Sequence, residues 1–326
     1  MTSPFDGREV EKALRPSHQG HAFDLDAALS SVVVLHARVP SDASTAQTLG
    51  EERLGNGIVI GEAGLVLTIG YLITEAEEVT LIAGDGRRIA AHALGVDSVT
   101  GLGLVHALEP LNLPALPLGD SRHLKDQDAI ILAGGGGRAH ATAGRLVGRA
   151  PFAGYWEYLL DEALFTAPGH PHWSGAGLIG PSGALMGVGS LQMTQQAPGG
   201  KPSLINMCVP IELLPPILDD LSRGRSAHPP RPWLGLFSQD GDGGGVVVLD
   251  VASGGPADRA EMSVGDVVLA VGGKTVANLA EFYTRLWALG PAGVTAPLRV
   301  KREGDVFEVE VRTVDRAARL RKRRYN

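Results

Sequence analysis

Short apolar runs, each closed by glycine or another turn residue, follow one another from residue 31 onward and limit what this chain can fold into. They begin with SVVVLHARV at 31–39 and continue with GIVIGEAGLVLTIG, EVTLIAGDGRRIAAHALGV, AIILAGGGG and ATAGRLVGRA. Glycine occupies 44 of the 326 positions, nearly twice its usual share of about 7%. Strands this short and closely spaced predict a mainly β fold, arranged as a sandwich or as barrels.

Two proline-containing stretches divide the chain. LEPLNLPALPLGDS at 108–121 interrupts the β pattern and is placed to link two barrels, and RSAHPPRP at 225–232 has the composition of an interdomain linker. Between them, PIELLPPILDDLSRG predicts two short turns, because its internal prolines break a helix. We predict an N-terminal segment (1–30), a β-barrel domain (31–222), a linker (223–231), a second domain (232–315) and a basic tail (316–326).

The second domain combines strands with one well-marked helix. Asn278 followed by Glu281 forms a capping box, and Leu279, Phe282 and Leu286 then fall on one face. This segment predicts an amphipathic helix packed on a small sheet.

Charge and composition exclude several classes of function. The formal net charge of -7 gives no reason to expect a nucleic-acid partner. The tail RAARLRKRRYN is predicted to be solvated and disordered, with docking on an acidic partner as the alternative. The single cysteine, Cys208, lies in an apolar run and is predicted to be buried. The first residues lack a recognisable leader and no run suits a membrane span, so we expect a cytoplasmic protein.

The segment HPHWSGAGLIGPSGALMGVGS, residues 170–190, presents Ser174 in the manner of a nucleophile. A serine hydroxyl reacts poorly unless a base and an orienting group assist it. His170 and His172 are candidate bases by proximity, although neighbours along a loop seldom reach the required geometry. As metal ligands they lack a third partner at a recognisable spacing, so no metal and no cofactor are expected.

From about residue 31 to 313 the chain resembles the HtrA/Deg family. The resemblance is carried by GNGIVIGEAGLVLTIGYLI, GVDSVTGLGLV, LPALPLGDSRHLKDQDAIILAGG and PWLGLF, in that order. It implies a chymotrypsin-like double β-barrel protease domain followed by a C-terminal PDZ domain. It also implies a homotrimer and a role in protein quality control.

The same resemblance indicates a degenerate catalytic triad. The family's histidine position is Tyr71 in TIGYLI, and its aspartate position is Gly101 in DSVTG, where only Asp97 is kept. A phenol with a reference pKa of about 10 is a poor base at neutral pH, and glycine cannot orient an imidazole. We expect Tyr71 to fill the cleft and pack beside Trp173.

The loop before Ser174 also departs from the family. The family's PGNSGGP becomes PGHPHWSGAGL, which is two residues longer and places His172 where an oxyanion-hole glycine is expected. Pro171 has no N–H to donate. We therefore predict an inactive protease homologue in which Ser174 is a remnant. The alternatives are an active or weakly active serine endopeptidase that uses Ser174 with a non-standard base, and an adaptor that docks through its basic tail.

For the second domain the resemblance implies peptide binding. The residues of its carboxylate-binding loop are Trp233, Leu234, Gly235 and Leu236, and the helix around Phe282–Trp287 forms the other wall of the groove. The expected partners are unfolded or C-terminal peptides of other proteins. One departure is Glu261, at a position where the family's glycine permits a left-handed turn, so we expect altered geometry there.

Overall fold

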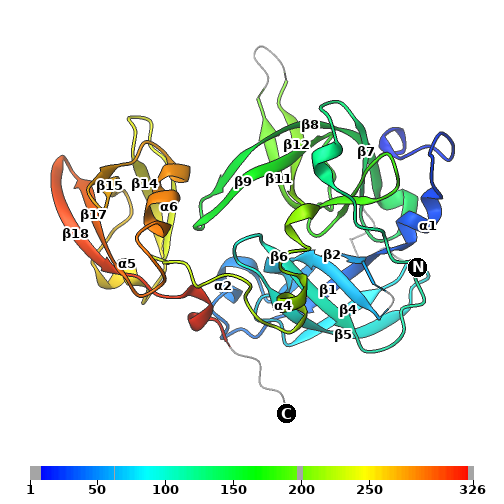
Figure 1. The fold of residues 1–326 in the computed structure, drawn as a ribbon, viewed down its shortest axis with the longest axis horizontal. Helices are drawn as coiled ribbons and strands as arrows, with labels where there is room; N and C mark the ends of the chain where they lie inside the picture. Colours follow the sequence, from blue (N-terminus) through cyan, green and yellow to red (C-terminus); the bar gives the residue numbers. More distant parts are fainter. Residues whose placement is uncertain (1–8, 62, 197–200, 322–326) are drawn as a thin grey trace. The chain divides into compact units, whose positions relative to one another are not determined.

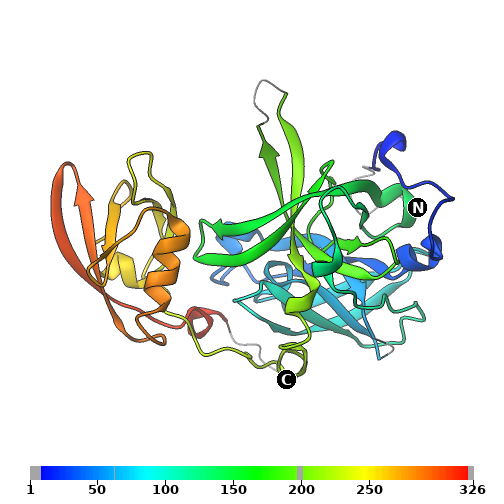
Figure 2. The same ribbon diagram turned by 45° about the horizontal axis from the view of Figure 1, so that its top comes forward.

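The computed structural model describes residues 9–61, 63–196 and 201–321, which separate into two compact units (Figure 1 and Figure 2). The first unit comprises the described residues of 1–150, 162–227 and 321–326. The second comprises Pro151–Asp161 and His228–Leu320. The segment 151–161, which the sequence suggested belongs to the first domain, is thus grouped with the second. The domain boundaries given above stay predictions.

The first half of the first unit is a closed antiparallel barrel, with strands in the order β1-β2-β3-β6-β5-β4. Apolar side chains such as Val33, Leu35 and Leu104 are completely buried in it, as the alternation of short apolar runs requires. Its strands are β1 (Val32–Arg38), β2 (Glu52–Val59), β3 (Leu65–Ile69), β4 (Glu78–Ile82), β5 (Arg88–Val96) and β6 (Leu102–Ala107).

A second closed barrel follows, in the order β10-β11-β12-β9-β8-β7. Cys208 packs in its core beside Leu132, Leu164 and Leu178, and burial raises the pKa of its thiol to about 12. The prediction of a buried cysteine is confirmed. The strands are β7 (Ala129–Ala133), β8 (Ala141–Gly154), β9 (Tyr158–Ala167), β10 (Gly177–Ile179), β11 (Leu185–Gln195) and β12 (Ser203–Pro210).

The links between these elements follow the proline pattern. The stretch 108–121 lies between β6 and β7, and PIELLPPILDDLSRG forms two separate turns, η4 (Ile211–Leu213) and α4 (Leu218–Ser222). Both predictions are confirmed. The other helical elements of this unit are η1 (Lys12–Leu14), α1 (Leu25–Ser30), α2 (Ala46–Leu49), α3 (Gly70–Ile73), η2 (Ser121–His123) and η3 (Gly137–His140).

The second unit contains an antiparallel sheet in the order β13-β14-β15-β17-β18, with β16 beside β15, so β13 is an edge strand. Figure 1 shows α6 packed against this sheet. The strands are β13 (Leu236–Asp240), β14 (Val246–Val251), β15 (Val267–Val271), β16 (Lys274–Thr275), β17 (Thr295–Arg302) and β18 (Asp305–Arg312). The helical elements are α5 (Pro256–Arg259), α6 (Leu279–Trp287) and η5 (Arg316–Arg319).

Helix α6 begins as its sequence predicts. The Asn278 side chain accepts the N–H of Glu281 at 2.9 Å, and the Glu281 carboxylate accepts the N–H of Ala277 at 3.1 Å. Leu279, Phe282 and Leu286 are all buried on the face that meets the sheet. These bonds satisfy amides that a helix start otherwise leaves open.

The turn after α5 corrects one expectation. Glu261 itself adopts the left-handed conformation, with φ at +60°, although it carries a side chain. Its N–H donates to the Asp258 carbonyl at 3.0 Å, and the Arg302 guanidinium donates to the Glu261 carbonyl at 2.9 Å. The expected change of geometry is therefore wrong, because these contacts hold the turn that glycine would form more easily.

The first residues of the basic tail are bound by the chain itself. In the second unit, the Arg319 guanidinium donates to the carbonyl of Gly254. In the first unit, Arg321 pairs with Asp42 and Glu77. The prediction of a disordered tail is wrong for 316–321, and the rest of the tail lies outside the described residues. Among the described residues, no helix is both long and apolar enough to cross a membrane.

Candidate active site and peptide groove

Tyr71 and Ser174 meet directly within the first unit. Tyr71 lies in α3 after β3, and Ser174 lies in the loop between β9 and β10. The Tyr71 hydroxyl is 2.6 Å from Ser174 Oγ and donates to the Ser190 carbonyl at 2.8 Å. Because a phenol has one proton and the carbonyl can only accept, Ser174 must be the donor in the first bond. The serine proton therefore points at a neutral phenol.

The phenol cannot serve as a base near neutral pH. Burial raises the pKa of Tyr71 to about 12, and hydrogen bonds with Ser174 and Trp173 only partly offset this effect. At pH 7 a group with such a pKa is ionised in about one molecule in 10⁵.

Gly101 lies where the chain turns back toward α3. Its N–H donates to the Asp97 carbonyl at 2.8 Å, and its own carbonyl accepts the N–H of Gly70 at 2.7 Å, directly before Tyr71. The Asp97 carboxylate accepts the N–H of Thr100 at 2.7 Å and so caps this turn. Gly101 has φ at +78°, a conformation that disfavours most side chains. The two predicted triad positions thus lie close together, but neither carries an imidazole or a carboxylate.

The loop that carries Ser174 is tied down by Asn56, a completely buried residue of β2. The Asn56 amide donates to the carbonyls of His172 at 2.8 Å and Ser174 at 2.9 Å, and its oxygen accepts the N–H of Gly135 at 2.8 Å. Sequence reasoning missed this residue. The available signal was a lone amide within the apolar run GNGIVIG, since a buried polar group needs partners.

His170, a candidate base by its proximity to Ser174, is completely buried. Its Nε2 lies 2.9 Å from the His140 carbonyl, and its Nδ1 accepts the N–H of His172 at 2.9 Å. Both contacts require the neutral ring with the proton on Nε2, and burial lowers the pKa of His170 to about 4. The ring is therefore structural, and the His172 N–H is engaged instead of being available to an oxyanion.

The His172 ring lies beside two other histidine rings, 5.8 Å from His140 and 5.9 Å from His170 between centroids. Within the described ranges, no three His, Cys, Asp or Glu side chains are arranged to hold a metal ion.

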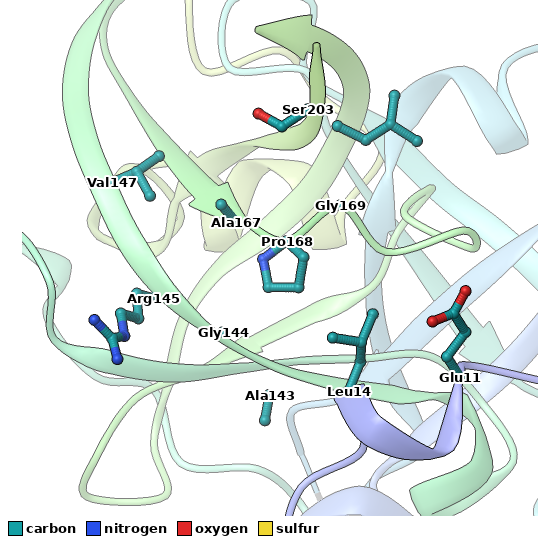
Figure 3. A pocket seen from close by; sticks show the side chains of 11 residues that line it. Glu11, Leu14, Ala143, Gly144, Arg145, Val147, Ala167, Pro168, Gly169 and Ser203 are labelled. Carbon is teal, nitrogen blue, oxygen red and sulfur yellow. The ribbon is translucent and has the colours of Figure 1, made fainter. Parts of the chain in front are cut away.

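A separate pocket of the first unit lies on the second barrel (Figure 3). It is lined largely by small and apolar residues of β8, by Ala167–Gly169 and by Leu204, with Glu11 and Arg145 as its charged groups. Tyr71 and Ser174 are not among its lining residues, so it adds nothing to the site described above.

In the second unit, three of the four predicted loop residues converge on one carboxylate. The N–H groups of Leu234, Gly235 and Leu236 donate to the side chain of Glu157 at distances of 2.7–3.1 Å. Gly235 has φ at +80°, which allows successive amides to face the same point. The fourth residue, Trp233, instead bonds its N–H to the Val314 carbonyl at 3.0 Å. Sequence reasoning did not identify Glu157.

Comparisons with known proteins agree with this architecture. A trypsin-like peptidase domain model matches residues 55–188 and a PDZ domain model matches residues 225–313. A probable periplasmic serine endoprotease DegP-like of Halomonas elongata is 29% identical over 288 residues, covering 83% of this chain and 58% of that protein. The serine endoprotease DegS of Salmonella typhimurium is 28% identical over 290 residues, covering 82% of this chain and 79% of that protein.

Among solved structures, a serine endoprotease from Yersinia pestis superposes with a TM-score of 0.52 at 22% identity, covering 91% of this chain and 99% of that one. At this identity the match supports the fold alone.

The prediction of a cytoplasmic location is contradicted by these comparisons, since the Halomonas relative is named as periplasmic. That prediction depended on the absence of a recognisable leader, and an absent signal is no positive evidence for a compartment.

The chain has two closed barrels followed by a PDZ domain, and the matches to known proteins cover both the barrels and the PDZ domain. The chain therefore belongs to the HtrA/Deg-like family.

Proposed function

We propose that this chain is a catalytically silent HtrA-like protein that binds extended peptides through its PDZ domain. The observation that carries the binding role is the convergence of the Leu234, Gly235 and Leu236 amides on a single carboxylate. A peptide's terminal carboxylate has the same chemistry, and the outer side of an edge strand such as β13 is where an extended peptide would pair with the sheet.

The silent protease domain is supported by the contacts of Ser174. Its hydroxyl proton points at the Tyr71 phenol, and Gly101 supplies no carboxylate to orient a base. The His172 N–H, at the position expected to help hold an oxyanion, is bonded to His170. A nucleophile without a base, and an oxyanion loop lacking one donor, lose the main sources of rate acceleration in acyl transfer.

Two alternative functions are an active serine endopeptidase and an adaptor that docks through its basic tail. The relatives are named serine endoproteases, and the 2.6 Å contact of Ser174 with Tyr71 is the observation that favours an unorthodox active site. The adaptor alternative is weaker, because Arg319 and Arg321 already bind carbonyl and carboxylate groups of this chain. We further propose a periplasmic location and a homotrimer, both from the family resemblance.

Matched peptides test the binding role. Decapeptides with a free apolar C-terminal residue should bind the full chain more than about tenfold more tightly than the same peptides with an amidated terminus, because amidation removes the charge that the three amides recognise. Fluorescence anisotropy with a labelled peptide library measures both forms. Equal affinities for the two forms, or no binder in the library, would argue against PDZ-mediated binding.

A further inference from the structure

The tip of the hairpin between β8 and β9 occupies the place that the proposed function gives to a peptide. Glu157 ends this tip, and its carboxylate accepts N–H groups from Leu234, Gly235 and Leu236. Glu157 is only 9% exposed. All of these residues belong to the second compact unit. The carboxylate-binding loop is therefore filled by a side chain of the same protein.

Backbone groups of the tip also bind the groove, in the way that a peptide ligand would. The N–H of Ser238, on the edge strand β13, donates to the Tyr155 carbonyl at 2.9 Å. On the side of α6, the Tyr283 hydroxyl donates to the Gly154 carbonyl at 2.8 Å and accepts the N–H of Glu157 at 3.2 Å. The tip thus contacts both walls of the groove, the edge strand and the helix, as an added peptide strand would.

Three further features of the tip support this contact. Glu157 adopts a left-handed backbone with φ at +61°, a conformation that glycine would take more easily. The Arg316 guanidinium donates to the Trp156 carbonyl at 3.3 Å, and the Tyr155 ring lies 6.1 Å from that of Phe237. A left-handed backbone persists at a residue with a side chain only where neighbouring contacts stabilise it. At Glu157 these contacts include the hydrogen bonds of its carboxylate.

The ionised carboxylate of Glu157 is buried at a cost in free energy. Burial raises the pKa of Glu157 to about 7, while the three amides and the charge of Arg316 pull it down. A raised pKa means that burying the ionised carboxylate is costly at neutral pH. The three amides and Arg316 offset part of this cost, and the same three amides are the donors that an outside carboxylate would need.

We propose that the PDZ groove is closed by its own hairpin tip, with Glu157 standing in for a peptide's terminal carboxylate, so that an outside peptide binds only by displacing it. This inference rests on the proposed function, because it concerns the same groove. A site that is free in only a fraction of molecules has an apparent affinity reduced by that fraction. Weakening the internal contact must then strengthen peptide binding.

The first test compares the full-length protein with two variants in titrations against fluorescein-labelled decapeptides that end in a free Val, Leu or Phe. Glu157→Gln removes the charge but keeps the shape, and we expect it to bind about tenfold more tightly. Asp161→Asn is the matched control, because it makes the same chemical change on the exposed face of β9. Equal affinities for the wild type and Glu157→Gln would overturn the inference while leaving the peptide-binding role intact.

The second test does not depend on finding a peptide. Hydrogen exchange at the amides of Leu234, Gly235 and Leu236, measured by NMR, should be slow in the wild type and at least about tenfold faster in Glu157→Ala. Asp161→Asn should leave it unchanged. Unchanged exchange in Glu157→Ala would overturn the inference. If exchange accelerates but no variant binds a peptide, the internal contact stands and the proposed function fails.

Discussion

Casein incubated with the purified chain is expected to stay intact, with cleavage at least about 10⁴-fold slower than by an HtrA-type endoprotease of intact triad. The cause is the state of Ser174, whose proton is directed at a phenol with a pKa of about 12. A base that does not accept a proton at neutral pH cannot generate the nucleophile. Fragment analysis by gel and mass spectrometry measures the rate.

The control for this prediction is Ser174→Ala, which should give the same background as the wild type. Casein cleavage that disappears in Ser174→Ala would sink the prediction, because it would show that this hydroxyl is activated by some other group.

Restoring the family's triad residues is expected to recover little proteolytic activity. The double variant Tyr71→His with Gly101→Asp should remain at least about 10²-fold slower than an active relative, since loss of a single oxyanion donor costs about that much. Two local features oppose the recovery of activity. Gly101 has φ at +78°, where a side chain costs about 1 kcal/mol, and the His172 N–H stays bonded to His170.

The same casein assay measures this double variant, with each single variant as its control. Rates within a few-fold of an active family member would contradict the prediction, because they would show that the lengthened loop still forms a sound oxyanion hole.

Local patterns predicted most of the fold. Alternating apolar runs located the barrel strands, internal prolines separated η4 from α4, and Asn278 marked the start of α6. Each of these features depends on residues close together in the chain, where backbone preferences and side-chain periodicity act directly.

What the sequence did not reveal depends on contacts between distant residues. Glu157 meets Leu234 across 77 positions, and Asn56 meets Ser174 across 118. His170 was considered as a base because it lies close to Ser174 in the sequence, yet its two ring nitrogens are satisfied by backbone groups that no local pattern identifies. Such partners become visible only when the fold brings them together.

Labelling with a fluorophosphonate probe tests the central claim most directly, because these reagents modify a serine only when its hydroxyl is activated. With a contact of 2.6 Å between Ser174 and a neutral phenol, we predict that labelling of the wild type does not exceed that of Ser174→Ala, while an active HtrA-type protease labels fully under the same conditions. Stoichiometric modification at Ser174, located by peptide mass spectrometry, would contradict the claim that this serine is a remnant.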